Sequence, residues 1–452
     1  MNAVKKTISK SLLLIFFTLL CFTPVLGQSP TLQLLYEYPL PSIGPNGNQT
    51  PLIHVADHDH LIALNYPHDK NLFVYDGNGS ILWNVSLPAE QSPWISSVAI
   101  TPNAQNILLA QLVPACCHGS VTNTSSNKII LFDKGGGKLW EYPTYSPPLA
   151  SAFTGENENV LIGTEDGRII SLDRQGTLLW EAKVDAPVIS LMTSADYNTI
   201  VATGESNYYA SKLYGEALNP HDLFVLDMNG TLLWNYQTRG TNTALVSDDG
   251  SVIAVLNQRS GHVLIFNRTG SLLGERSFAG TSPTISLAGD GSLIVIRTAE
   301  GFVYGLDQRG SLMWNVSVQP ESQGIALDNE KNVFTGNGRN ISLFTKSGKL
   351  QGDYPVGSSV RFIYSSPDRK LIVIGTEQKL RVFSTKVSVA GMGGSIPAGK
   401  PNITVMNNFQ NGSSSVAQTS GPNPAPFSPI TCIGALICTG LVVSFVRRDF
   451  NE

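Results

Sequence analysis

Short apolar runs alternate with short polar turns along most of the chain, and one combination of the two recurs. Its clearest copy is the apolar run 224–226 with Asp227, followed by the Trp-bearing run 230–234. Two β-rich runs around so short a turn predict a hairpin, in which Asp accepts hydrogen bonds from turn amides and Gly takes a positive φ. In the next repeat a Ser-Asp-Asp-Gly turn at 247–250 joins two further apolar runs. Each repeat is therefore predicted to hold four strands.

Counted at the Asp position, eight copies of this hairpin follow one another. The positions are 76, 133, 173, 227, 267, 307, 345 and 384, and five of the seven intervals are 38 to 40 residues long. That is the length of a four-stranded propeller blade. We expect the tryptophans of the complete copies to pack between neighbouring blades. The structural positions of these copies are Asp76, Trp83, Asp133, Trp140, Asp173, Trp180, Asp227, Trp234, Asp307 and Trp314. The pattern predicts an all-β, eight-bladed β-propeller, or seven blades if one degenerate copy is something else.

The last repeat suggests how the ring closes. It holds three strands, from about Val360 to Ser384, and lacks a fourth. Near the N-terminus, Leu34 to Leu40 resembles an isolated fourth strand with Tyr36 at the Trp position. Pairing of these two segments would close the propeller and remove its open edges.

Both ends of the chain carry membrane signals. A lysine-bearing start, an apolar core and small residues before Gly27 predict a signal peptide at 1–27, with an uncleaved anchor as the alternative. The uncharged run 430–446, followed by two arginines, predicts a C-terminal transmembrane helix and a short cytoplasmic tail at 447–452. This tail also resembles the C-terminal sorting signals of archaeal surface proteins, which are cut and replaced by a lipid. Whether the segment is retained stays open.

Between the predicted propeller, 28–386, and the membrane segment lies 387–429. It is rich in Gly, Ser, Asn and Pro, which predicts a flexible stalk. The chain is thus expected to be exported, monomeric and anchored at the cell surface. Ten Asn-x-Ser/Thr sequons agree with export, although Pro51 makes Asn48 a poor acceptor. The other candidate glycosylation sites are Asn78, Asn84, Asn123, Asn229, Asn267, Asn315, Asn340, Asn402 and Asn411.

Composition and charge exclude several functions. Charged residues make up 14% of the chain, the formal net charge is −4, and the body of the chain has no basic run. A nucleic-acid partner is therefore not expected, because it needs a positive stripe facing the phosphates. The sequence also lacks a Gly-x-Ser-x-Gly elbow, a His-Glu-x-x-His helix and a phosphate-binding loop. No catalytic residues are predicted, and the protein is not expected to be an enzyme.

Two long intervals, of 57 and 54 residues, point to a binding region. Their extra sequence lies between the second and third strands of blades two and four, at 112–127 and 205–222. Both inserts should emerge on one face and flank blade three, where variable loops on a rigid scaffold often bind. The second insert supplies candidate ligand-binding residues, Tyr208, Tyr209 and Tyr214, which suit recognition of a protein or glycan. Alternatively, these tyrosines pack the loop onto its own blade.

The first insert holds Cys116, Cys117 and His118. In an oxidising compartment the two cysteines form a vicinal disulfide, stay free, or bind a metal with His118; the sequence leaves these alternatives open. All three are candidate residues of the binding rim.

A second histidine cluster lies near the start of the propeller. It comprises His54, Asp57, His58, Asp59 and His60, and we expect it in the first hairpin turn of blade one, on the face opposite the cysteines. Such clusters are usually solvated turns, so no metal site is predicted here.

The Asp, Gly and Trp spacing resembles the pyrroloquinoline-quinone (PQQ) type of propeller repeat over residues 31–386. That family includes quinone-dependent alcohol dehydrogenases and cofactor-free scaffolds such as the propeller lipoprotein of bacterial outer-membrane assembly. The former place a vicinal disulfide against PQQ and calcium. This resemblance implies, as an alternative, a quinone- or metal-dependent oxidoreductase using Cys116 and Cys117. Because no set of calcium-binding Glu, Asn and Asp is visible, no cofactor is expected. The leading hypothesis is a cell-surface binding or scaffold module for an extracellular protein or glycan.

Overall fold

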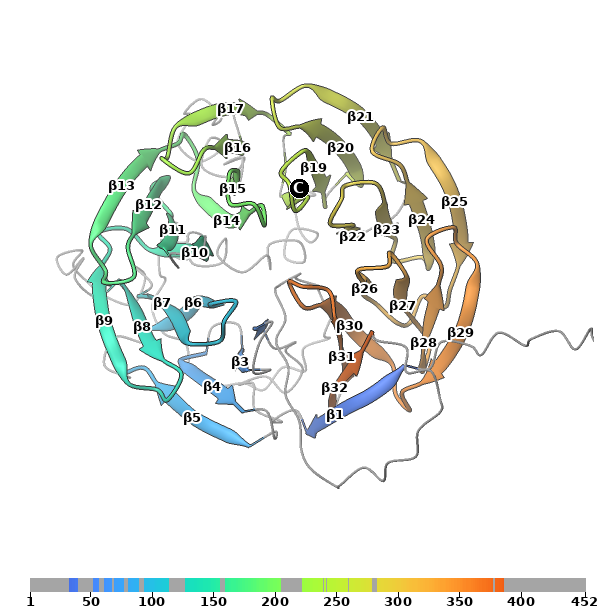
Figure 1. Cartoon of the computed structure of the whole chain (residues 1–452), viewed down its shortest axis with the longest axis horizontal. Coiled ribbons are helices and arrows are strands. Elements are labelled where there is room, and N and C mark those ends of the chain that lie inside the picture. Colours follow the sequence, from blue (N-terminus) through green and yellow to red (C-terminus); the bar gives the residue numbers. More distant parts are fainter. Residues whose placement is uncertain are drawn as a thin grey trace, which may run out of the picture. The chain divides into compact units, whose positions relative to one another are not determined.

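The structure is a computed structural model, and the residues it describes form a ring of eight sheets (Figure 1). By contacts the chain divides into 1–31 and 32–452; the ring belongs to the second unit, and the first lies outside the described residues. The described ranges are 32–39, 52–56, 61–66, 69–76, 80–88, 93–113, 127–154, 159–204, 222–238, 240, 242–258, 260–278, 283–376 and 379–385.

Each sheet is a blade of four antiparallel strands, named from the centre outward. Blade 1 holds β2 (Leu52–Val55), β3 (Ile62–Asn65), β4 (Asn71–Tyr75) and β5 (Ile81–Ser86). Blade 2 holds β6 (Trp94–Ile100), β7 (Asn106–Leu112), β8 (Lys128–Asp133) and β9 (Lys138–Pro143). Blade 3 holds β10 (Pro148–Thr154), β11 (Asn159–Thr164), β12 (Arg168–Leu172) and β13 (Leu178–Lys183). Blade 4 holds β14 (Val188–Thr193), β15 (Ile200–Gly204), β16 (Leu223–Leu226) and β17 (Leu232–Tyr236).

The second half of the ring repeats this arrangement. Blade 5 holds β18 (Asn242–Val246), β19 (Val252–Asn257), β20 (His262–Asn267) and β21 (Leu272–Ser277). Blade 6 holds β22 (Thr284–Leu287), β23 (Ile294–Arg297), β24 (Phe302–Leu306) and β25 (Leu312–Ser317). Blade 7 holds β26 (Ile325–Leu327), β27 (Val333–Asn337), β28 (Asn340–Phe344) and β29 (Leu350–Pro355). Blade 8 holds β30 (Val360–Ser365), β31 (Leu371–Thr376), β32 (Lys379–Ser384) and, outermost, β1 (Gln33–Pro39).

The predicted closure by the N-terminal strand is confirmed, and the ring has eight blades rather than seven. Strand β1 pairs with β32 from Gln33 opposite Ser384 onward, as Figure 1 shows for β1. Tyr36 lies opposite Val382, after the same one-residue register shift that precedes Trp83 and its counterparts in the other outer strands. The N-terminal strand thus serves as the fourth strand of blade 8, and its Tyr36 occupies the position that Trp has in other blades.

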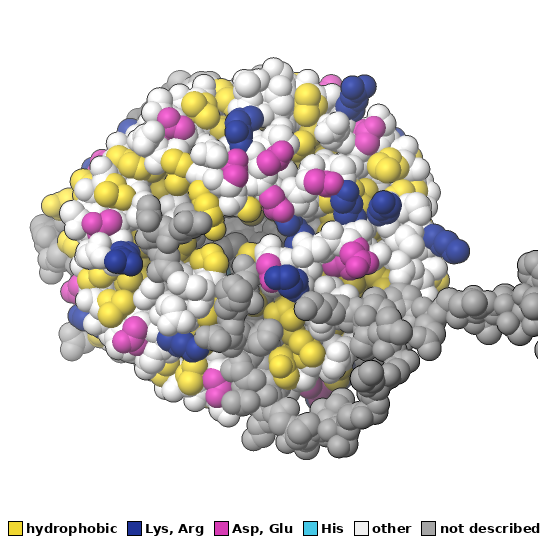
Figure 2. Space-filling model, in the orientation of Figure 1, with side chains coloured by type: hydrophobic (Ala, Val, Ile, Leu, Met, Phe, Trp, Pro, Cys, Tyr) yellow, Lys and Arg dark blue, Asp and Glu magenta, His cyan; other side chains and the backbone are white. Residues whose placement is uncertain are grey.

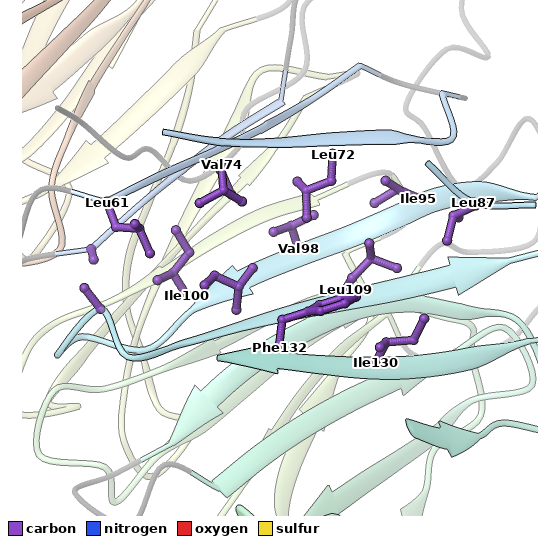
Figure 3. Packing of buried hydrophobic residues seen from close by; sticks show 14 residues of the cluster. Leu61, Leu72, Val74, Leu87, Ile95, Val98, Ile100, Leu109, Ile130 and Phe132 are labelled. Carbon is purple, nitrogen blue, oxygen red and sulfur yellow. The ribbon is translucent and has the colours of Figure 1, made fainter. Parts of the chain in front are cut away.

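The core of the ring lies between blades. Side chains alternate between the two faces of each strand, so each buried strand contributes to two neighbouring clusters. Between blades 1 and 2 the cluster includes Leu72 and Val74 from one sheet and Val98, Leu109 and Phe132 from the other, all buried (Figure 3). Every blade is therefore packed on both faces, and each junction has its own buried cluster.

Tryptophan connects successive blades on their outer sides. In five blades its indole nitrogen donates to the carbonyl of the residue after the Asp position in the next blade, at 2.8–2.9 Å. For example, Trp234 of blade 4 donates to Arg268 of blade 5. The ring of Trp234 also covers Gly270, whose φ of +84° and missing side chain leave room for the indole. The Asp position serves the turn itself, since Asp227 accepts hydrogen bonds from the amides of Asn229 and Thr231.

Three junctions lack this tryptophan, and one of them has Tyr36 of blade 8 in its place. Gly274 of blade 5 and Gly352 of blade 7 stand at the Trp position. At Gly274 the backbone lies against the Arg309 carbonyl of blade 6, leaving no room for a side chain. Blade 5 therefore joins blade 6 through close backbone approach instead of an indole.

The predicted signal peptide, stalk and membrane helix lie outside the described residues. Among the residues that are described, no helix is long and apolar enough to cross a membrane.

Candidate functional site

Successive strand connections emerge on alternate faces of the ring, which defines two surfaces. We call insert face the one that carries the connections between second and third strands and between blades. The turn face carries the turns between first and second and between third and fourth strands. Both predicted inserts follow second strands, β7 and β15, so they leave and re-enter the ring on the insert face. Blade 3 lies between them.

The first insert begins and ends on a buried polar contact. Asn127, 8% exposed, accepts a hydrogen bond from the Val113 amide through its side-chain oxygen at 2.8 Å. Its backbone carbonyl accepts another from Thr144, in the connection to blade 3, at 2.9 Å. The two ends of the insert are thus held together and joined to the neighbouring blade.

The second insert has a comparable base around Asp222, which is fully buried. The Asp222 carboxylate accepts hydrogen bonds from the amides of Thr238, at 2.7 Å, and Gly240, at 3.2 Å. Its backbone carbonyl accepts one from Gly204, the last residue before the insert. Since a buried carboxylate needs such donors, we infer that Asp222 fixes the geometry from which the insert starts.

The innermost strands below the inserts are irregular at the same face. Register shifts place a β-bulge at Ser96, Leu149 and Ile189 in blades 2, 3 and 4, and at Arg361 in blade 8. Ser96 donates from its hydroxyl to the Pro148 carbonyl of the next blade at 2.6 Å. Bulges redirect side chains and often border binding sites. Three of these four bulges lie in the neighbouring blades 2–4, below the two inserts.

A network of charges covers blade 3 between the inserts. Arg168 lies 2.9 Å from Asp166 and 3.7 Å from Glu181. Burial raises the pKa of Asp166, but the Thr164 hydroxyl and the charges of Lys183 and Arg168 hold it below its ordinary value. Next to it, burial and the charge of Asp166 raise the pKa of Glu165. The network is internally paired and presents both signs of charge to solvent.

Beside this network a shallow pocket opens between blades 2 and 3. Its lining includes Tyr142, Ser146, Asp166, Arg168 and Glu181. At its margin Tyr145 is 75% exposed, the most exposed of the large hydrophobic side chains in the described chain. An exposed aromatic ring next to fixed polar groups is a common arrangement for recognising a protein or a sugar.

The turn face is organised differently. Arg369 of blade 8 donates two hydrogen bonds to Asp248 of blade 5, at 2.9 and 2.8 Å, so the pair crosses the ring instead of joining neighbours. Arg369 has a φ of 55°, in the left-handed region, as does Lys331 at 65°, which pairs with Asp290. On the face shown in Figure 2, acidic and basic side chains lie close together around the centre. The turns of blades 5 to 8 are therefore already occupied by contacts with one another.

The expectation that His54 lies in a hairpin turn is wrong. His54 lies within β2 opposite Ala63, 4% exposed, and faces the apolar cluster between blades 1 and 2. Neither ring nitrogen has a hydrogen-bond partner. Burial alone lowers its pKa from 6.5 to about 3. His54 is polar and lies next to the turn in the sequence, yet it belongs to the core because the neighbouring blade covers it.

We expect replacement of His54 by Leu to raise stability at pH 7 by about 1 kcal/mol, because it removes two buried unpaired nitrogens. It should also flatten the acid side of the stability profile. Between pH 6.5 and about 3 the unfolded chain binds one more proton at His54 than the folded chain, so this contribution falls as pH drops. The difference between the two proteins should grow by about 1.4 kcal/mol per pH unit in that window. Denaturant unfolding at several pH values measures it, with His262→Leu, at a partly exposed histidine, as the control.

The other predicted site residues lie outside the described residues. These are Cys116, Cys117, His118, Tyr208, Tyr209, Tyr214, Asp57, His58, Asp59 and His60. Within the described ranges, no three His, Cys, Asp or Glu side chains gather as metal ligands. The structure instead adds Tyr145, Asp166 and Arg168, which were not anticipated. Arg168 and Glu181 could have been found by comparing equivalent repeat positions, where basic and acidic residues face each other in several blades.

Comparison with known proteins agrees with the geometry. Residues 125–298 match the family model described as outer membrane protein assembly factor BamB. This match covers less than half of the chain, and the ring is similar to PQQ-like β-propeller repeats. The comparison with curated proteins gave no match.

Solved structures show the same fold at low identity. BamB from Moraxella catarrhalis is similar over 78% of this chain and 100% of its own, with a TM-score of 0.52 and 15% identity. The C-terminal WD40 domain of Sif2 covers 75% of this chain and 97% of its own, with a TM-score of 0.52 and 10% identity. The Dos1 propeller is similar over 78% of this chain and 96% of its own, with a TM-score of 0.57 and 11% identity. The chain is thus similar in fold to BamB-type and WD40-type propellers.

Proposed function

We propose that the chain is an exported, surface-anchored propeller that binds an extracellular protein or glycan through the insert face of blades 2–4. One observation carries this proposal: both inserts start from fixed polar bases, at Asn127 and Asp222, on either side of blade 3. Rigid bases under variable loops are typical of binding surfaces on stable scaffolds. The pocket beside Tyr145 lies between these bases and offers an aromatic anchor.

The turn face supports the same choice. Its central turns are joined by the pair of Arg369 and Asp248 and by the pair of Lys331 and Asp290. The charged groups of these turns are therefore already paired with one another. The insert face offers the exposed ring of Tyr145 at the margin of the pocket.

The proposal predicts that Tyr145→Ala lowers affinity for the partner at least about tenfold, as loss of an exposed aromatic anchor commonly does. Replacing 205–221 by a short Gly-Asn turn should abolish binding, while the base at Asp222 keeps the ring folded. The unfolding midpoint of Tyr145→Ala should differ from that of the intact chain by less than about 2 °C, because Tyr145 contributes little to the core. Binding is measured with the full chain against a glycan array and against the partner cross-linked at the cell surface.

Phe302→Ala is the matched control, since Phe302 is also an exposed aromatic side chain but lies in blade 6, away from blades 2–4. Unchanged binding by the insert replacement would disprove the proposed site. The proposal assigns no catalytic step. The oxidoreductase alternative instead requires a stoichiometric quinone or metal, which an absorption spectrum and metal analysis of the exported chain would detect.

A further inference from the structure

The outer strand of every blade leaves one sheet edge free, and a single repeat position recurs on it. This position directly follows the Trp position and always carries an acid or an asparagine. Its members are Glu37, Asn84, Glu141, Glu181, Asn235, Glu275, Asn315 and Asp353. All are exposed except Asn235, which is half-buried. Charges on a free edge prevent another chain from pairing with it, so this position protects the edge.

In four blades the protecting residue is a glutamate with a basic partner. The partner stands at the start of the third strand of the same blade. The pairs are Glu141 with Lys128 at 3.2 Å, Glu181 with Arg168 at 3.7 Å, Glu275 with His262 at 3.5 Å, and Glu37 with Lys379. The edge therefore carries a fixed charge in these blades.

Blades 1 and 6 depart from this arrangement in the same way. Both read Trp-Asn-Val-Ser, so Asn84 and Asn315 are exposed sequon asparagines at the protecting position. The third strand begins with Asn71 in blade 1 and Phe302 in blade 6, and neither is basic. No hydrogen bond joins either asparagine side chain to another described residue. In these two blades the protecting position therefore carries a free amide instead of a charge pair.

We propose that Asn84 and Asn315 are modified with N-linked oligosaccharides, and that these glycans protect the edges of blades 1 and 6. The inference rests on the export included in the proposed function. The asparagine amide nitrogen forms a bond to C1 of a sugar carried by a lipid-linked oligosaccharide. The bond from C1 to the lipid phosphate breaks, and one amide proton leaves to a base. No oxidant or reductant takes part.

The surroundings of both residues suit a first sugar. Directly paired residues share a face of a sheet, so Asn84 lies beside Phe73 and Asn315 beside Tyr304. Phe302, 45% exposed, lies one pleat along the same face as Tyr304. An aromatic ring left partly bare beside the acceptor offers an apolar surface on which a sugar ring packs.

Asn267 is a sequon in a contrasting position. It stands at the Asp position of blade 5, and its side-chain oxygen accepts hydrogen bonds from the amides of Thr269 and Ser271. Its amide plane is therefore fixed within the turn. We expect this asparagine to remain largely unmodified.

Glycopeptide mass spectrometry of the full chain, purified from membranes of cells that export it, tests the proposal. Most copies should carry glycan at Asn84 and at Asn315. Ser86→Ala and Ser317→Ala destroy the two sequons while keeping the asparagines, and should remove both glycans. Asn235→Gln, at the same repeat position without a sequon, should leave the mass of every glycopeptide unchanged.

The protective role is tested by association of the same proteins. The combined Ser86→Ala and Ser317→Ala variant should form several-fold more dimer and higher oligomer in sedimentation velocity, whereas Asn235→Gln should not. Unmodified Asn84 and Asn315 on a chain whose signal peptide is gone would overturn this proposal and leave the binding function standing. A chain that keeps its signal peptide and stays inside the cell would overturn both.

Discussion

Removal of residues 31–40 is expected to lower the unfolding midpoint of the ring by at least about 10 °C, or to abolish cooperative folding. The deletion removes β1, which pairs with β32 along six residue pairs. It also removes Tyr38, 5% exposed, from the cluster between blades 8 and 1. With β32 left as a bare edge, the ring loses its closure and exposes a template for association.

Smaller changes separate the parts of this effect. Tyr38→Ala alone should cost about 3 kcal/mol, as for other large buried side chains. Glu37→Gln should cost less than about 1 kcal/mol, because its pairs with Lys379 and Arg381 are partly exposed. Thermal unfolding measures all three variants, and a peptide of residues 28–41 should restore the midpoint of the deletion. A deletion that melts like the intact chain would show that β1 does not close the ring.

This closure could be predicted from the sequence because the repeats carry the same residue types at the same positions. Asp and Gly mark the outer turn, Trp marks the outer strand, and Tyr36 fits the missing Trp position. The number of blades therefore follows from the spacing of these residues. The N-terminal strand could then be aligned with the fourth strands of the other blades. The structure places Tyr36 opposite Val382, where the alignment requires it.

Contacts that depend on the closed ring could not be predicted in this way. Asp248 and Arg369 lie 121 residues apart in the sequence, and the residues of neither turn predict that the two side chains pair across the ring. His54 looked like part of a polar turn, although burial against blade 2 decides its environment. The pocket beside Tyr145 likewise arises where two blades meet. Local patterns define blades, whereas the site is built from junctions between them.

Gly270→Ala is expected to destabilise the ring far more than Gly310→Ala, although the two glycines occupy the same turn position. Their φ angles are +84° and +75°, so both substitutions carry the left-handed strain of about 1 kcal/mol. At Gly270 an added Cβ would lie only 2.8 Å from the Trp234 ring. At Gly310 the nearest atoms are 3.5 Å away, because blade 5 has Gly274 in place of Trp. We expect about 3 kcal/mol for Gly270→Ala, strain and overpacking together, and about 1 kcal/mol for Gly310→Ala.

A double-mutant cycle attributes the excess to the indole. Trp234→Ala alone should cost about 3 kcal/mol, because it loses buried ring surface and the hydrogen bond to Arg268. In that background Gly270→Ala should cost only the backbone strain of about 1 kcal/mol, since the ring it would meet is gone. Denaturant unfolding of the four proteins gives the coupling. Equal costs for Gly270→Ala with and without Trp234 would mean that the indole does not lock blade 4 to blade 5. A coupling near 2 kcal/mol would instead show that each Trp and the glycine of the next turn act as one unit, which explains why the repeat carries both.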